Sequence, residues 1–236
     1  MKNQYFGDVN DYRKYGLLRV LVRSSGLRLL VSWMLTPDDG SGDGEFRRYL
    51  QEPRSLRACD PVLFDALADL TSGSTRAVSL IEASGLLPRA TFFRDLVPDD
   101  RLGREGFGSR LVAASADADL VFLDPDNGIE VASRPVGRKG SSKYVSWSEL
   151  DALWAAGKSL LIYQHFQREP RAAFSSAISA QLQARTGAPY LKAFHTPHVL
   201  FILVAQAAHQ ATITTSARDG LEAWKGQIDA SGLLVG

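Results

Sequence analysis

The stretch 119-DLVFLDPDNGIE-130 decides the fold. Its apolar residues do not alternate with polar ones, so we expect a strand over 119–124 that is buried on both faces, as in a parallel sheet covered by helices. The run ends in Asp124-Pro125-Asp126-Asn127-Gly128, where proline removes a backbone donor and glycine permits conformations that other residues resist. Such a turn can present a carboxylate and free carbonyl groups to a ligand, although Asp-Pro and Asn-Gly are also ordinary turn dipeptides.

The rest of the chain alternates between helical and strand patterns. We expect further strands at 28–35, 90–96, 158–166, 190–196 and 198–206, and helices at 11–25, 61–70, 75–85, 109–116, 146–157, 170–185 and 216–227. This order predicts an α/β, Rossmann-like fold: a mostly parallel sheet with helices on both faces and an antiparallel C-terminal hairpin. The first helix carries interleaved arginines and a lysine, which we expect on an outer, basic face.

Composition limits the classes of protein to consider. With 236 residues, of which 45% are hydrophobic, we expect a single domain over 1–236, with an insertion around 41–60 and a basic loop at 131–144. The formal net charge of +1 gives no global field for a polyanion, and the single cysteine, Cys59, excludes an internal disulfide. The chain has no apolar run near the ~20 residues that span a bilayer and no signal-like start, so we expect a soluble, cytoplasmic protein without a membrane partner.

In parallel sheets, ligands bind at the carboxyl ends of the strands. Three expected strand ends are polar, and they should lie along one rim: 36-TPDD-39, 124-DPDN-127 and 164-QH-165. His165 there could be a base, a metal ligand or a hydrogen-bond donor, or could simply cap its strand.

Two motifs resemble the ribosomal RNA adenine-amine methyltransferases, which have the class I S-adenosylmethionine-dependent methyltransferase fold. The run 121-VFLDPDNG-128 resembles their Asp/Asn-Pro-Pro-aromatic motif. The run 5-YFGDVNDYRKYGLLRVL-21 resembles their leading helix segment, with the matching residues Phe6, Gly7, Asp11, Lys14, Tyr15, Leu17 and Leu18. The order of elements also agrees over about two-thirds of the chain.

The resemblance implies a mechanism. Asp124 and the Pro125 carbonyl would accept hydrogen bonds from an exocyclic adenine amine and orient it toward the methyl group of S-adenosylmethionine, while an aromatic ring stacks on the base. Asp126 stands where the second proline belongs and Asn127 where the aromatic residue belongs. The candidate catalytic residues are Asp124, Pro125, Asp126, Asn127 and His165, and the stacking ring would come from Tyr144, Trp147 or Phe166.

The resemblance also implies a cofactor site after the first strand, where 33-WMLTPDDGSGDG-44 replaces the usual acidic residue and Gly-x-Gly turn. Asp38 or Asp39 could bind the ammonium or ribose of S-adenosylmethionine, although a solvated loop explains the same residues. The candidate cofactor-binding residues are Lys14, Thr36, Asp38, Asp39 and Gly40. For a nucleic acid or nucleotide substrate, the basic loop combines cations with rings, and the candidates are Arg138, Lys139, Lys143, Tyr144, Trp147 and Phe166.

Three functions follow as hypotheses. The first is an S-adenosylmethionine-dependent methyltransferase that acts on nucleic acid, with no metal ligands. The second is a Mg²⁺- or Mn²⁺-dependent phosphoesterase or nuclease, in which Asp124, Asp126 and His165, with Asp38 or Asp39, form an oxygen-rich site. The third is a non-catalytic, methyltransferase-like nucleotide-binding protein. Under the first hypothesis, we expect Asp124→Ala to remove activity with little loss of fold, because the residue ends a strand.

Overall fold

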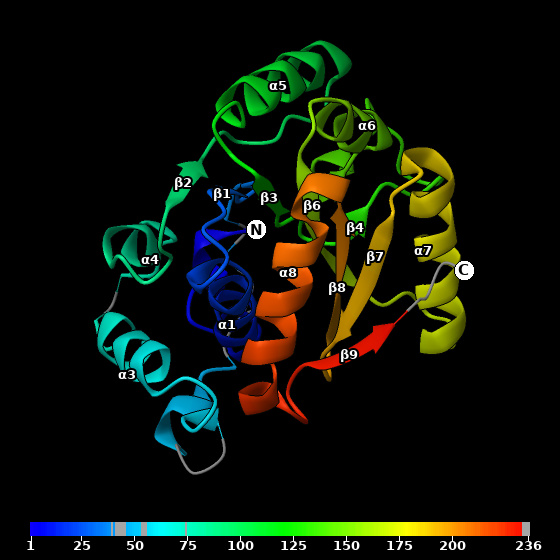
Figure 1. The fold of residues 1–236 in the computed structure, drawn as a ribbon. Coiled ribbons are helices and arrows are strands. Elements are labelled where there is room, and N and C mark those ends of the chain that lie inside the picture. The colour runs from blue at the N-terminus through cyan, green and yellow to red at the C-terminus, as the bar shows by residue number, and fades with distance from the viewer. Residues whose placement is uncertain (39, 41–45, 53–55, 74, 233–236) are drawn as a thin grey trace.

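The computed structural model describes residues 1–38, 40, 46–52, 56–73 and 75–232. Its centre is a seven-stranded sheet in the order β2-β1-β3-β6-β8-β7-β9 (Figure 1). The strands are β1 (Leu29–Ser32), β2 (Ala90–Phe93), β3 (Leu120–Leu123), β6 (Ser159–His165), β7 (Tyr190–His195), β8 (Val199–Ala205) and β9 (Asp229–Gly232). A separate parallel ribbon pairs β4 (Gly128–Ile129) with β5 (Tyr144–Val145).

The sheet is parallel from β2 through β6, and the hairpin of β7 and β8 then joins it in antiparallel fashion. β8 pairs antiparallel with both β6 and β7, and β9 pairs antiparallel with β7. The expected Rossmann-like α/β fold with an antiparallel C-terminal hairpin is therefore confirmed. The final strand, β9, was not expected from the sequence.

β3 is central, and its four residues are fully buried. It pairs with β1 on one side and β6 on the other, so Leu120 and Phe122 enter the core on one face of the sheet while Val121 and Leu123 enter the core on the opposite face. This is the two-sided burial that the unbroken apolar run predicts.

Helices cover both faces of the sheet (Figure 1). One face packs against α1 (Val9–Arg23), α3 (Pro61–Leu70), α4 (Ser79–Ala83) and α8 (Ala207–Gly220). The other packs against α5 (Arg101–Ala114), α6 (Trp147–Ala155) and α7 (Arg171–Thr186). Short 3-10 helices lie at Asn3–Tyr5, Arg48–Gln51, Ser141–Lys143 and Glu222–Trp224. Among the described residues, the helices are all too short or too polar to cross a membrane.

Several expected boundaries differ from the structure. The helix expected at 109–116 begins earlier, at Arg101, because Asp100 caps it and its three glycines are tolerated inside the helix. The helix expected at 216–227 is instead α8 with a 3-10 turn after it, and that expected at 75–85 is reduced to five residues. Of the expected insertion around 41–60, residues 41–45 and 53–55 lie outside the described residues, and a 3-10 helix covers Arg48–Gln51.

The expected basic outer face of the first helix is wrong. Arg13, Lys14 and Arg19 of α1 are all buried, because this helix lies between the sheet and its neighbours α3 and α8. Arg19 pairs with Asp60 at 2.7 Å. A side chain at Gly16 would meet the Trp224 ring at 2.1 Å, so the helix can approach this buried indole only through a glycine. Of the four basic residues on α1, only Arg23 in the last turn is exposed, and the other three belong to the interior.

Candidate ligand site at the carboxyl ends of β1 and β3

The strand order reverses between β1 and β3. The chain leaves β1 toward β2 on one side and returns as β3 on the other, so the connections after the two strands diverge. In open α/β sheets, the crevice outside the carboxyl ends at such a point is where ligands bind. The residues beside this crevice are those that follow β1, from Trp33 to Asp38, and those that follow β3, from Asp124 to Asn127.

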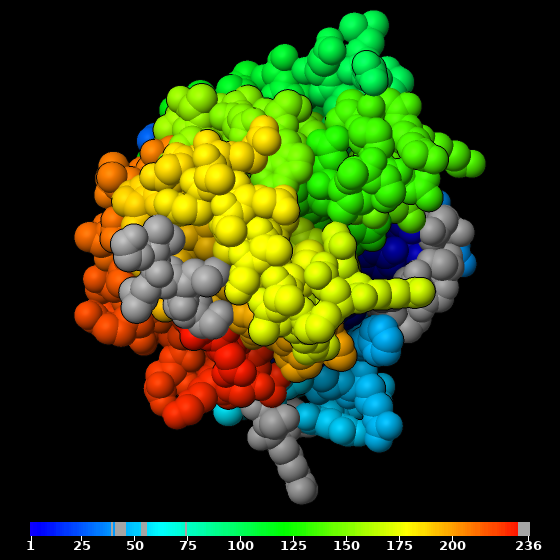
Figure 2. Space-filling model, turned by 90° about the vertical axis from the view of Figure 1, so that its right-hand side faces the viewer, coloured from blue at the N-terminus to red at the C-terminus, as the bar shows by residue number. Residues whose placement is uncertain are grey.

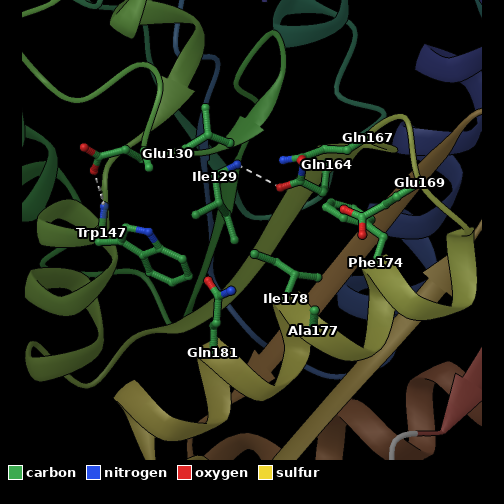
Figure 3. Close-up of a pocket in the computed structure, with 12 residues that line it drawn as sticks. Ile129, Glu130, Trp147, Gln164, Gln167, Glu169, Phe174, Ala177, Ile178 and Gln181 are labelled. Atoms are coloured by element: carbon green, nitrogen blue, oxygen red, sulfur yellow. Dashed lines mark hydrogen bonds between the residues drawn. The ribbon is translucent and has the colours of Figure 1, made fainter.

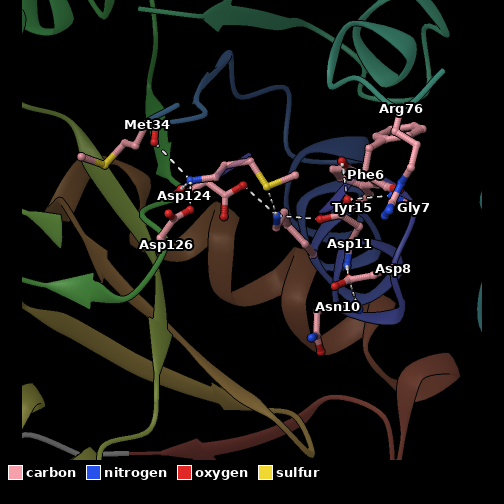
Figure 4. Close-up of polar contacts among 12 residues, drawn as sticks. Phe6, Gly7, Asp8, Asn10, Asp11, Tyr15, Met34, Arg76, Asp124 and Asp126 are labelled. Atoms are coloured by element: carbon pink, nitrogen blue, oxygen red, sulfur yellow. Dashed lines mark hydrogen bonds and ion pairs between the residues drawn. The ribbon is translucent and has the colours of Figure 1, made fainter. Parts of the chain in front are cut away.

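Asp124 belongs to a buried charge cluster rather than to an open surface. Its Oδ2 lies 2.7 Å from Nζ of Lys14, which also lies 2.8 Å from Oδ1 of Asp11 (Figure 4). The three side chains are at most 3% exposed. Asp8 positions the cluster, since its carboxylate caps α1 by accepting hydrogen bonds from the amides of Asn10 and Asp11 at 2.7 and 2.9 Å. A helix started at Asp8 aims Lys14 at the end of β3.

Burial and charge perturb each member of the cluster. Burial lowers the pKa of Lys14, but the carboxylates of Asp11 and Asp124 outweigh it and raise that pKa above its usual value. Burial raises the pKa of Asp124, against the opposing effect of Lys14. Burial together with the charge of Asp11 raises the pKa of Asp8 to about 7. Lys14 therefore stays charged at neutral pH and is the cation that compensates the buried carboxylates of Asp11 and Asp124.

The first residue of the chain fills the crevice. The Met1 ammonium lies 3.1 Å from the carbonyl oxygens of Met34 and Asp124 and 2.6 Å from Oδ1 of Asp126. Its carbonyl accepts a hydrogen bond from the Thr36 amide at 2.9 Å. Thr36 Oγ1 in turn donates to Asp126 Oδ2 at 2.8 Å. Met1 thus bridges the ends of β1 and β3, and Figure 2 shows the N-terminal segment, in dark blue, at the floor of a hollow.

Backbone strain marks the same position. Met34, just after β1, has a φ of +46°, a left-handed conformation that is uncommon for a residue with a side chain. Its carbonyl is one of the three oxygens around the Met1 ammonium. Strained backbone of this kind collects at ligand sites, where the surrounding structure holds it in place.

The turn after Asp126 is fixed to the neighbouring strand. The Asn127 amide donates to the Lys143 carbonyl at 2.9 Å, and the Asn127 carbonyl accepts from the His165 amide at 3.1 Å and from Gln164 Nε2 at 3.2 Å. Gly128 has a φ of +124°, and a Cβ there would lie 2.3 Å from the Gln164 side chain. Gly128 is therefore required by the close approach of the turn to β6, and the turn is more than a surface feature.

The space left at this site is small. The cavity is lined by Asp124, Pro125, Asp126 and His165 from the strand ends, and by Met1, Tyr5, Asp8, Asn10, Asp11, Lys14 and Tyr163. Its volume is about 40 Å³, which is enough for water molecules and too small for a nucleobase while Met1 is in place. The exposed His165 ring lies edge-on to Tyr163, with centroids 5.2 Å apart. Partial desolvation by the surrounding chain lowers the pKa of His165, against the opposing charge of Asp126.

The structure gathers some of the predicted cofactor-binding residues here. Lys14 contacts Asp124, and Thr36 contacts Asp126. Asp38 Oδ1 accepts from the Gln4 amide at 3.4 Å, so it holds the N-terminal segment. Gly40 has a φ of +65° and open space around it, and Asp39 lies outside the described residues.

The predicted substrate-binding residues are spread more widely. Trp147 lines a second, larger cavity (Figure 3). Phe166 packs against Phe174 and His195 and lies under the Arg171 guanidinium at 4.6 Å. Tyr144 is half-buried in β5, and the exposed basic residues are Arg138, Lys139 and Lys143. Asp99 anchors their loop by accepting from the backbone amides of residues 140 and 142 at 2.8 and 2.6 Å.

The divalent-metal alternative does not fit these side chains. The carboxylate of Asp124 is bound by Lys14 and that of Asp126 by the Met1 ammonium, so internal cations already take the place a metal would need. Across residues 1–38, 40, 46–52, 56–73 and 75–232, His, Cys, Asp and Glu side chains do not gather in threes with an arrangement that could hold a metal ion.

Sequence reasoning missed several residues that build the site. Met1, Asp8, Asp11 and Tyr163 all line the small cavity, and none was a candidate on its own. A signal was present in 8-DVNDYRK-14, where Asp8, Asp11 and Lys14 follow one another at intervals of three residues, close to Tyr12 and Tyr15. Charges that share a helical stripe with buried aromatics indicate a buried ion pair.

Comparisons with known proteins leave the family open. No protein-family model matches the chain, and no curated protein matches it significantly. Among solved structures, human methyltransferase-like protein 13 in complex with SAH matches at 11% sequence identity and a TM-score of 0.36, over 95% of this chain and 96% of that one. A match at this TM-score adds no weight to the assignment of the fold, which rests on the strand order and register described above.

Proposed function

We propose that this protein is an S-adenosylmethionine-dependent methyltransferase whose cofactor binds in the crevice between β1 and β3. One observation carries the proposal: this crevice surrounds the α-ammonium of a methionine with the carbonyls of Met34 and Asp124 and the carboxylate of Asp126. S-adenosylmethionine contains a methionine, with the same ammonium joined to its sulfur through the same carbon chain. Oxygen acceptors arranged for one ammonium suit the other.

The position in the fold supports the same ligand. A Rossmann-like sheet binds its ligand at the point where the strand order reverses, and Met1 lies at that point. Binding of the cofactor's ammonium by the same oxygens requires Met1 to leave the crevice. The cofactor and the N-terminal residue would then compete, so the apparent affinity for the cofactor is reduced by the fraction of molecules in which Met1 is bound.

For the acceptor, we propose a base amine in a nucleic acid or nucleotide. Support comes from the resemblance of the Asp124-Pro125 turn to the adenine-orienting motif and from the exposed cations of the loop at 131–144. The bound cofactor would supply the electrophilic methyl group. Lys14 holds the Asp124 carboxylate in one orientation at 2.7 Å. His165, whose pKa desolvation lowers, is neutral at pH 7 and is suited to accept the proton that an amine loses on methylation.

Ligand-induced thermal stabilisation tests the proposal. SAH, the demethylated product of the cofactor, should raise the Tm, because a ligand that binds only the folded state stabilises it by mass action. Asp126→Asn should weaken SAH binding by about tenfold or more, since it removes a charged acceptor of the ammonium. The matched control is Asp117→Asn at a carboxylate that is 99% exposed, and it should bind SAH as the unmodified chain does.

A second variant separates weak binding from competition. A chain released from a fusion so that it begins at Lys2 lacks the Met1 side chain and moves the ammonium, so it should bind SAH more tightly than the full chain. If isothermal titration detects no SAH binding to either chain, the cofactor assignment is wrong. Equal Kd values for the two chains would show that Met1 and SAH do not compete, and would therefore refute the placement of the cofactor's ammonium on these oxygens.

A further inference from the structure

The cavity that contains Trp147 lies outside the β1–β3 crevice. It is bounded by β4 and the residues that follow it, the start of α6, the end of β6 and one side of α7 (Figure 3). Its volume is about 550 Å³. Cavities of about 300–1,000 Å³ hold small ligands in proteins. Its volume exceeds that of the cavity beside Asp124 by more than tenfold.

The walls of this cavity suit a flat, apolar surface. Ile129, Phe174 and Ile178 are buried and form an apolar floor. The half-buried Trp147 indole, at the start of α6, extends toward the helix that carries Ile178 and Gln181 (Figure 3). An indole that is partly exposed beside an apolar floor can stack on a base, and such stacking is worth about 1–3 kcal/mol per base.

The polar groups of the cavity differ in whether they are available to a ligand. The Gln164 amide is engaged, since it accepts from the Ile129 amide at 2.8 Å and donates to the Asn127 carbonyl of the turn and to the His165 carbonyl of β6. Both Glu130 oxygens accept from backbone amides, those of Val136 and Trp147. The exposed Gln181 amide makes no hydrogen bond to the described part of the chain and points toward the Trp147 ring (Figure 3). A free amide offers one donor and one acceptor, the pair that glutamine uses to bind N6 and N7 of adenine.

Charge at the cavity favours a base over a phosphate. Its titratable lining residues are Glu130 and Glu169, and neither lysine nor arginine lines it within the residues that the structure describes. The adjacent Arg185 is paired with Asp151, and its guanidinium carbon lies 5.0 Å from the centre of the Trp147 ring. A phosphate placed in this cavity would meet the carboxylates of its lining, and the cation beside the cavity is already paired.

The cavity and the β1–β3 crevice share one turn. Asp126 holds the ammonium on one side, and Ile129, three residues later, forms the floor of the cavity on the other. Three residues span at most about 10 Å, so ligands in the two sites could approach each other across the turn.

We propose that this cavity binds the acceptor base, an adenine stacked on Trp147 and read at its N6 and N7 edge by Gln181, with the sugar and phosphate outside. The proposal rests on the proposed function for its role as acceptor site, and the adenine binding itself can be measured without the cofactor.

The experiment is adenosine binding measured by saturation-transfer NMR and isothermal titration, with and without saturating SAH. Ala177 lines the cavity and is exposed, so Ala177→Phe fills the space without disturbing packed side chains. Ala180 is exposed on the same helix and does not line the cavity, which makes Ala180→Phe the matched control. Ala177→Phe should weaken adenosine binding by at least tenfold, and Ala180→Phe should leave it unchanged.

A second pair of measurements tests the recognition of the base. Inosine carries an acceptor in place of the amine and should bind the unmodified chain about tenfold more weakly than adenosine. Gln181→Leu should abolish that preference.

Four results would overturn the proposal. The first two are that adenosine does not bind to the unmodified chain, or that it binds equally well to Ala177→Phe. The third is that SAH displaces adenosine, which would make this the cofactor's own adenine site, and the fourth is that Nα-acetyl-lysine amide binds and adenosine does not. If the unmodified chain binds adenosine but not SAH, the cofactor assignment is wrong and the cavity is still an adenine site.

Discussion

Replacing Lys14 by methionine should destabilise the fold strongly. The Lys14 ammonium lies between the carboxylates of Asp11 and Asp124 at 2.8 and 2.7 Å, and all three side chains are at most 3% exposed. Methionine keeps most of the side-chain volume and removes the charge, which leaves two buried carboxylates without their shared cation. Breaking a buried ion pair in this way costs about 3–5 kcal/mol. For a chain of this length, that lowers the Tm by about 6–20 °C.

Urea and thermal unfolding followed by circular dichroism measure the effect at pH 7. Lys225→Met is the matched control, because Lys225 is exposed and the same atoms change. The loss of unfolding free energy in Lys14→Met should become smaller as the pH falls toward 5. Burial raises the pKa of Asp124, and the variant lacks Lys14, the strongest of the groups that oppose this rise, so the buried carboxylate is protonated more readily. An unfolding free energy within about 0.5 kcal/mol of the Lys225→Met value would refute the buried-cluster reasoning, since ordinary surface substitutions fall in that range.

Three further predictions follow from the same structure. Burial raises the pKa of Asp8 from 3.8 to about 7. Between these pH values the folded state binds more protons than the unfolded state, so stability falls as the pH rises. Asp8→Asn should therefore remove a slope of up to about 1.4 kcal/mol per pH unit from the plot of unfolding free energy against pH, measured by urea unfolding at pH 5 to 8. Gly128→Ala should cost more than Gly140→Ala in chemical unfolding, because both have positive φ but only at Gly128 does a Cβ meet a side chain, at 2.3 Å. A variant with glutamine in place of Arg138, Lys139 and Lys143 tests whether the basic loop binds phosphates of a nucleic acid. If it does, the slope of log K against log salt in filter-binding titrations should fall by about 0.9 for each phosphate that is no longer neutralised. An unchanged slope would show that these three cations do not contact the nucleic acid.

The fold could be predicted from the sequence because its signals are local. The unbroken apolar run before Asp124 determines a central strand, and the Asp60-Pro61 and Ser146–Glu149 pairs determine where two helices begin. Boundaries failed where tertiary contacts outweigh local preference. Three glycines in 103–108 suggest a loop, yet the Asp100 cap and the packing of Phe107 and Leu111 make this stretch helical.

The candidate site was only partly predictable, because its key contacts join residues far apart in the sequence. The strand-end residues Asp124 and Asp126 follow from the sheet pattern alone. Their partners do not: Lys14 is 110 residues from Asp124, and periodicity placed it on a solvated face. For the same reason, the expectation that Asp124→Ala leaves the fold nearly intact gives way to the expectation that this substitution destabilises it. A carboxylate that is 2% exposed and paired with a buried ammonium contributes to stability wherever it lies on its strand.

The two departures from the resembled motif differ in what the structure explains. Asp126, in place of the second proline, supplies the carboxylate that binds an ammonium at 2.6 Å, which a proline could not do. Asn127, in place of the aromatic residue, fixes the turn to Lys143 and β6 through its backbone amide and carbonyl, contacts that an aromatic residue could also make. Because residue 127 carries no ring, the stacking ring of the proposed function would have to come from another element, and Trp147 lines the cavity that begins at Ile129. Under that proposal, the altered turn separates an ammonium-binding side at Asp126 from a base-binding side at Ile129.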